Sequence, residues 1–142
     1  LQAYPAEAIR LYLLQNHYRS SLPWSSTALR EALGKLLRLY EAKELALQMN
    51  GTEKVDQLLS SYKEPAQNVW DLSQAFTSKF LASLDDDFNT AQALSHIFEL
   101  ARAVNRLGAC KKAKKRAIKT TIISNTIFHL SVIFGPLFTS YI

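Results

Sequence analysis

A run of cations between Lys111 and Lys119 is the part of this sequence best suited to binding chemistry. Side chains spaced at 3.6 residues per turn would spread these cations over a broad helix face. A phosphate backbone fits such a face, and each phosphate that is neutralised makes binding more sensitive to salt. A solvated helix face, a linker and a helix lying on an anionic membrane remain alternatives. The basic residues of the run are Lys111, Lys112, Lys114, Lys115, Arg116 and Lys119.

The segment His17–Ser20 is the second candidate for binding. Tyr18 places a flat aromatic ring beside the guanidinium of Arg19, and such a pair can stack an unpaired base and bind a phosphate. The alternative is structural: Tyr18 packs under the neighbouring helix, and Arg19 pairs with a carboxylate such as Asp86 or Asp87. Both interpretations stay open at this point.

Residues for catalysis or metal binding are not grouped in the sequence. His17, His96 and His129 lie far apart, and Cys110 is the one cysteine, so no metal-ligand spacing occurs. The adjacent carboxylates of Asp85–Asp87 lack the alternate spacing of a calcium loop, and no glycine-rich phosphate loop is present. We therefore predict no catalytic, cofactor-binding or metal-binding residue here, and no catalysis by this chain alone.

The charge of the chain is unevenly distributed. The 142 residues carry a net charge of +5, yet residues 101–142 hold eight Lys and Arg and no acidic residue. The first hundred residues hold nine basic and twelve acidic groups. This asymmetry indicates an end of the chain that faces a polyanion. A lone cysteine fits a reducing compartment, so a cytoplasmic location is expected.

Apolar periodicity predicts the elements that must position these groups. Stripes at helical spacing predict an all-α, antiparallel bundle of about five helices. Asn89 is expected to cap one of them in a capping box with Gln92. The stretch Ile122–Ile142 is too often interrupted by polar residues to span a membrane, so no membrane partner is expected. The predicted helices run from Pro5 to about Gln15, from Ser25 or Ser26 toward Met49, from Pro65 to Leu84, from Asn89 to Leu107 with a stop at Gly108, and from about Lys111 to Phe134; a further short one is allowed within residues 52–65.

Three of these helices carry well-defined apolar stripes. Their members recur at intervals of three and four residues, which places them on one face of a helix. We expect this face to form the core of the bundle. The stripes are Leu29, Leu33, Leu36 and Tyr40, then Val69, Leu72, Phe76 and Phe80, and finally Leu94, Phe98, Ala101 and Val104.

Two motifs resemble one known family. The word Asp-Asp-Asp-Phe-Asn-Thr at residues 85–90, followed by Phe98-Glu99-Leu100 and Asn105, resembles the C-terminal helical region of cysteinyl-tRNA synthetases. The segment Glu7–Leu14 and the His-Tyr-Arg-Ser word at residues 17–20 resemble the first helix and the following loop of that family's DALR domain. The resemblance covers about residues 1–107, whereas residues 108–142, a basic helix and an apolar tail, match only weakly.

The resemblance implies that residues 1–142 form a single DALR-type anticodon-binding domain. Such a domain would dock tRNA-Cys for a cysteine–tRNA ligase, whose catalytic domain, with ATP and zinc, would lie upstream. The implied partners are tRNA-Cys and that catalytic domain, and no cofactor is expected in this chain. Tyr18, Arg19 and the cations of the run are the candidate RNA contacts. The alternatives are a helical domain for a protein or membrane partner, and the helical part of a cysteine:amino-sugar ligase that handles no RNA.

Overall fold

The computed structural model describes residues 4–48 and 64–109. These ranges contain four α-helices and no strand, which confirms the all-α prediction. The last predicted helix and the short one allowed within residues 52–65 fall largely or wholly outside the described residues. The helices are α1 (Ala6–Leu14), α2 (Ser26–Gln48), α4 (Glu64–Asp85) and α5 (Thr90–Ala109).

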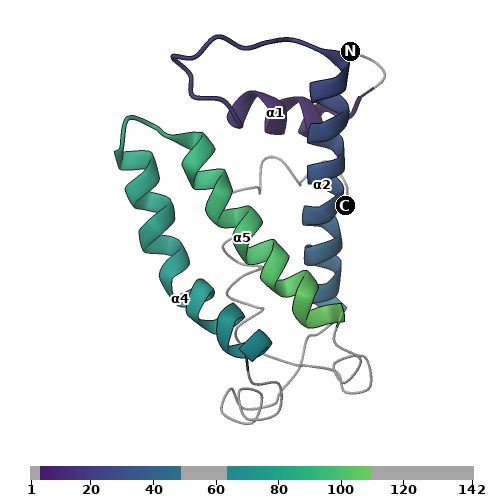
Figure 1. The fold of residues 1–142 in the computed structure, drawn as a ribbon, viewed down its shortest axis with the longest axis vertical. Coiled ribbons are helices and arrows are strands. Elements are labelled where there is room, and N and C mark those ends of the chain that lie inside the picture. The colour runs from purple at the N-terminus through teal and green to yellow at the C-terminus, as the bar shows by residue number, and fades with distance from the viewer. Residues whose placement is uncertain (1–3, 49–63, 110–142) are drawn as a thin grey trace.

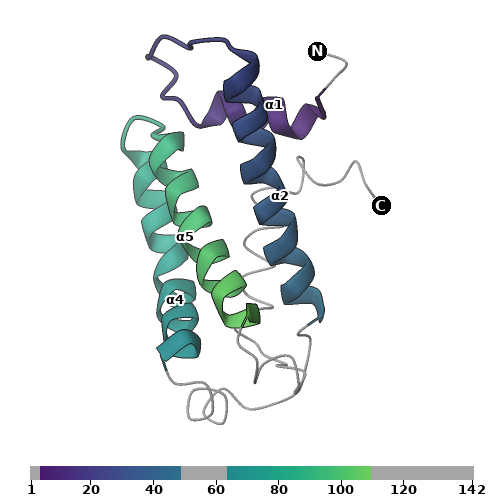
Figure 2. The ribbon, with the colours of Figure 1, turned by 45° about the vertical axis from the view of Figure 1, so that its right-hand side comes forward.

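Helix α5 is the central element of the bundle. It packs against α4 over most of its length, against α2 on another side, and against part of α1. Helices α4 and α5 form an antiparallel pair, as predicted, whereas α2 runs in the same direction as α5 (Figure 1). Helix α1 crosses one end of this arrangement, close to the start of α2 (Figure 2). Because α5 touches every other described helix, it determines how they are positioned.

The core follows the predicted stripes. All twelve stripe residues are buried or partly buried, and Ile97, Leu100 and Val104 of α5 are almost completely enclosed. They belong to one apolar cluster with Val69 and residues of α1 and α2. Complete burial of one such side chain contributes about 1.5–3 kcal/mol. The apolar face of α5 is therefore the main source of stability for the described part of the chain.

Two helix starts carry the predicted caps. The Ser25 hydroxyl accepts a hydrogen bond from the Ala28 N–H at 3.1 Å, and the Asn89 side-chain oxygen accepts one from the Gln92 N–H at 3.0 Å. The reciprocal bond of a capping box is not formed, because the Asn89 N–H donates to backbone carbonyls of the preceding turn. Each cap satisfies a backbone donor that the helix itself leaves unpaired.

The predicted stop at Gly108 is wrong. Helix α5 includes both Gly108 and Ala109, the last of the described residues. A glycine that ends a helix adopts positive φ, and none of the described glycines does so. Glycine inside a helix costs about 1 kcal/mol relative to alanine, but Leu107 and Gly108 are both buried. Burial of this last turn outweighs the low helix propensity of glycine.

Candidate functional site

Two loops that are distant in sequence meet at one end of the molecule (Figure 1). The Tyr18 hydroxyl donates to the Asp87 carboxylate at 2.7 Å, and a terminal nitrogen of Arg19 lies 3.2 Å from the same oxygen. The His17 Nε2 lies 3.2 Å from the backbone oxygen of Asp87 and 3.7 Å from its carboxylate. We call His17, Tyr18, Arg19, Asp87 and Phe88 the loop corner. Asp87 is the residue that joins its two halves.

The aromatic and cationic groups of the loop corner are stacked on one another. The His17 and Tyr18 rings lie 4.8 Å apart, and the Arg19 guanidinium lies 5.2 Å from the centre of the Tyr18 ring. The hydrogen bond to the Asp87 carboxylate raises the pKa of the Tyr18 phenol above its ordinary value, because it stabilises the protonated hydroxyl. The structural alternative is therefore correct for Arg19, which pairs with Asp87. It is wrong for Tyr18, which is 61% exposed rather than packed under a helix.

The turn that supplies Asp87 has an unusual backbone. Asp87 and Phe88 have φ values of 50° and 52°, in the left-handed region, which costs about 1–2 kcal/mol per residue for side chains other than glycine. The Phe88 N–H donates to the Leu84 carbonyl at 3.0 Å, and the Thr90 N–H donates to the Phe88 carbonyl at 2.7 Å. These bonds hold the turn, and the Phe88 side chain is left 69% exposed.

The charge of this end of the molecule is negative. Asp85, Asp86 and Asp87 are consecutive and exposed, and Asp87 is paired with Arg19. Phosphates would meet a surface with more negative than positive charge. The loop corner therefore suits an unstacked base, which can lie against Tyr18 or Phe88, better than a phosphate backbone.

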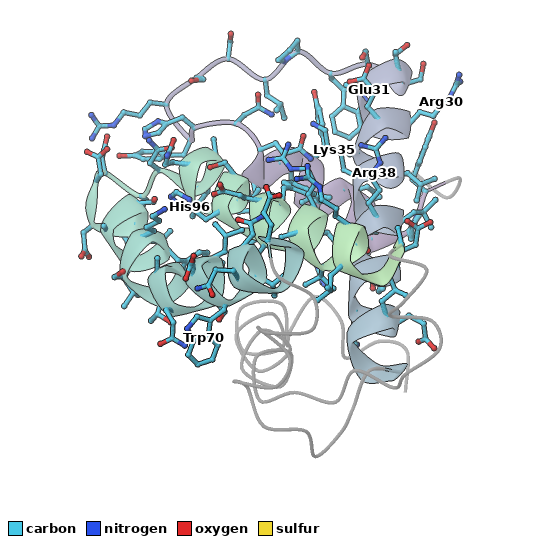
Figure 3. The ribbon with its side chains drawn as sticks, turned by 60° about the horizontal axis from the view of Figure 1, so that its bottom comes forward. Arg30, Glu31, Lys35, Arg38, Trp70 and His96 are labelled. Carbon is cyan, nitrogen blue, oxygen red and sulfur yellow. The ribbon has the colours of Figure 1, made fainter. Side chains whose placement is uncertain are left out.

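A second surface, the α2–α5 groove, has the opposite character. Three cations line it: Lys35 and Arg38 from α2, and Arg102 from α5. No carboxylate is among its lining residues, and within the described ranges none of the three cations forms an ion pair. Figure 3 shows Lys35 and Arg38 on the side of α2 that faces α5. The other lining residues are Gln15, Ala91, Leu94, Ser95, Phe98, Ala101 and Asn105.

Two amide side chains in the α2–α5 groove have unused hydrogen-bonding atoms. The Gln15 oxygen accepts a hydrogen bond from the Lys35 ammonium, which leaves the Gln15 Nε2 buried without a partner among the described residues. The Asn105 Nδ2 donates to the Arg38 carbonyl at 3.3 Å, and its oxygen is buried and similarly unpaired. Buried polar atoms normally have partners. Both atoms are enclosed by the protein, so the groups that the groove presents to an anion are its three cations.

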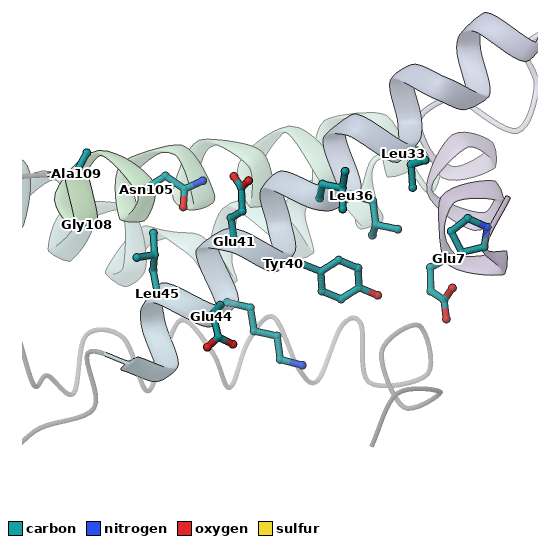
Figure 4. A pocket seen from close by; sticks show the side chains of 13 residues that line it. Glu7, Leu33, Leu36, Tyr40, Glu41, Glu44, Leu45, Asn105, Gly108 and Ala109 are labelled. Atoms are coloured by element: carbon teal, nitrogen blue, oxygen red, sulfur yellow. The ribbon is translucent and has the colours of Figure 1, made fainter.

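A larger groove lies between α2 and the ends of α1 and α5 (Figure 4). Glu7, Glu41 and Glu44 line it together with a single lysine, Lys43, several apolar residues and Asn105, which lines both grooves. Three carboxylates against one ammonium make this groove unfavourable for phosphate. Of the two grooves, the α2–α5 groove is the one suited to an anion.

The described residues contain no arrangement typical of a metal site or a membrane span. Across residues 4–48 and 64–109, no three His, Cys, Asp or Glu side chains are grouped to hold a metal ion. Within the same ranges, no helix is both long and apolar enough to cross a bilayer.

Comparison with known proteins shows which family the chain resembles. Residues 79–135 match the DALR domain family. The chain is 37% identical over 137 residues to the cysteine–tRNA ligase of Shigella sonnei, an alignment that covers 96% of the chain and 25% of that enzyme. It is 45% identical over 107 residues to the ligase of Alkalilimnicola ehrlichii, covering 75% of the chain and 20% of the enzyme. The chain is a DALR-domain relative of the cysteine–tRNA ligases.

The match to these ligases extends over both candidate surfaces. An alignment over 96% of the chain can leave out only a few residues at its ends, so the loop corner and the α2–α5 groove both lie inside it. The DALR family match begins near the end of α4 and includes the turn of Asp87 and all of α5. The chain spans about a quarter of the length of the ligase from Shigella sonnei.

Most of the RNA contacts predicted for this ligase relative lie beyond the described helices. Lys111, Lys112, Lys114, Lys115, Arg116 and Lys119 are outside the described residues. Of the predicted residues, the structure brings only Tyr18 and Arg19 together, and it adds Asp87 and Phe88 to them. The role of all these residues in binding RNA remains a prediction.

The cations of the α2–α5 groove were missed by sequence reasoning. Lys35 and Arg38 are three residues apart and therefore neighbours on one helix face, which is a weak signal. Arg102 is more than sixty residues further along the chain. Only the packing of α2 against α5 brings the three cations into one groove, so no local pattern could identify them.

Proposed function

We propose that this chain is the tRNA-docking domain of a cysteine–tRNA ligase, and that its RNA partner is tRNA-Cys. The observation that carries the proposal is the similarity to proteins named cysteine–tRNA ligase along 96% of the chain. The parent enzyme joins cysteine to tRNA with ATP, in a catalytic domain that also holds zinc. This domain contributes position rather than chemistry, and its catalytic domain is its protein partner. We place the enzyme in the cytoplasm, where tRNA is charged.

The two surfaces divide the work of binding in this proposal. Phosphate contacts position a nucleic acid, and base contacts give specificity. Tyr18 and Arg19 provide an exposed aromatic ring and a guanidinium for a base or for the backbone beside it. The basic run from Lys111 to Lys119 provides positive charge for phosphates. We treat residues 1–142 as one domain in which these contacts act together.

The test is a fluorescence titration of the 142-residue chain with tRNA-Cys and with one non-cognate tRNA, at about 50 and 200 mM salt. We expect binding that weakens steeply with salt and differs little between the two tRNAs, because positioning contacts dominate. Absence of binding at 50 mM salt would contradict the proposal and favour the cysteine:amino-sugar ligase alternative. Co-sedimentation with anionic vesicles in place of RNA binding would favour a membrane partner.

A further inference from the structure

We propose that the α2–α5 groove is a binding site for the sugar–phosphate backbone of RNA, with Lys35, Arg38 and Arg102 as its phosphate contacts. The inference rests on the RNA-docking function proposed above and assigns the contact to residues outside both the basic run and the loop corner. The inference is carried by the unpaired cations of the groove and by its apolar lining.

The three cations of the α2–α5 groove are available for an anionic ligand. Within the described ranges, no carboxylate lies close enough to Lys35, Arg38 or Arg102 to form an ion pair. Arg19 in the loop corner, in contrast, is already paired with Asp87 at 3.2 Å. A phosphate at the loop corner would have to displace a carboxylate. A phosphate in the groove would displace only water and counterions, and their release favours binding.

The floor of the groove also fits a nucleic acid backbone. Leu94, Phe98 and Ala101 line it between the cations, and Leu94 and Ala101 are buried residues of the core. An apolar floor between charged sides accommodates sugar carbons while the phosphates reach the cations. Inorganic phosphate uses only the charged part of such a site. The groove therefore matches an RNA backbone better than a free anion.

The experiment compares the 142-residue chain with a double variant, Arg38→Gln with Arg102→Gln, and with a control, Arg30→Gln. Arg30 is an exposed residue of α2 that does not line the groove (Figure 3). Binding of tRNA is titrated at about 50 and 200 mM salt, and circular dichroism establishes that each variant is folded. The measured quantity is the ratio of the tRNA affinity at about 50 mM salt to that at about 200 mM salt. Loss of two phosphate contacts should make this ratio about tenfold smaller, while Arg30→Gln should leave it nearly unchanged.

The outcomes separate the groove from the wider function. If the unaltered chain does not bind tRNA, the proposed function itself is wrong. If it binds and the double variant keeps the same salt dependence, only the groove is wrong. An equal effect of Arg30→Gln would also contradict a specific groove. Inorganic phosphate added at constant ionic strength should displace little RNA, and displacement in the low-millimolar range would show that a free anion is the ligand.

Discussion

The loop corner and the α2–α5 groove present charged side chains in opposite ways. In the loop corner Arg19 is paired with Asp87, the rings of Tyr18 and Phe88 are exposed, and two further exposed carboxylates precede Asp87 in the chain. In the groove three cations have no carboxylate partner among the described residues and flank an apolar floor. A conspicuous sequence motif and an unpaired charge therefore need not coincide. The Tyr-Arg pair is easy to see in the sequence, but its charge is already used within the fold.

The largest effect is expected from a substitution in the buried core of α5, the helix next to both surfaces. Ile97 is fully buried in α5, and its replacement by alanine should lower the free energy of unfolding by about 2–5 kcal/mol. Urea denaturation monitored by circular dichroism gives this value. Since α5 lines the groove and begins directly after the turn of Asp87 and Phe88, RNA binding and the Tyr18–Asp87 contact should weaken together as the variant unfolds. Independent loss of only one would show that the two regions do not depend on the same core.

A smaller effect is expected at the end of α5 next to the loop corner. Asn89→Ala removes the side-chain acceptor for the Gln92 N–H and should cost about 1 kcal/mol of stability. The groove cations are not touched by this change, so the salt dependence of tRNA binding should be unaltered under folding conditions. Denaturation and salt titration of the same variant test both statements. A changed salt dependence would mean that the two regions are coupled through the turn.

Gly34→Ala should stabilise the helix that carries Lys35 and Arg38. A Cβ at Gly34 would meet no atom within 4 Å, and alanine is favoured over glycine inside a helix by about 0.5–1 kcal/mol. We expect a higher midpoint of denaturation and unchanged affinity for tRNA. A lower midpoint would indicate that a Cβ at residue 34 collides with neighbouring atoms. A change in affinity would indicate that RNA lies across α2 at this residue.

The smallest expected effect tests whether the loop corner can be made to behave like the groove. Asp87→Asn removes the carboxylate that pairs with Arg19, so the guanidinium could contact a phosphate. One added phosphate contact should make the ratio of the tRNA affinities at about 50 and 200 mM salt roughly threefold larger. Asp86→Asn is the matched control, because it makes the same charge change in the same turn. Equal effects of the two variants would mean that only net charge matters there.

Much of the fold could be predicted because it depends on local patterns. The stripes beginning at Leu29, Val69 and Leu94 give the buried faces, and the caps at Ser25 and Asn89 give two helix starts. Gly108 was misjudged because burial, a tertiary property, outweighed its low helix propensity. The pairing of Arg19 with Asp87 was one of two alternatives, and only the meeting of the two loops decides between them. The groove could not be predicted, since its cations come from helices that are distant in sequence.

The length of α5 has a consequence for any ligand that reaches both regions. Its first residue, Thr90, adjoins the turn of the loop corner, and Arg102 lies twelve residues further along the same helix. At about 1.5 Å per residue, this interval is about 18 Å along the helix axis. A helix resists stretching along its axis, so this separation does not adjust to the ligand. An RNA that touched both regions would therefore have to present a base and a phosphate at that interval, whatever its sequence.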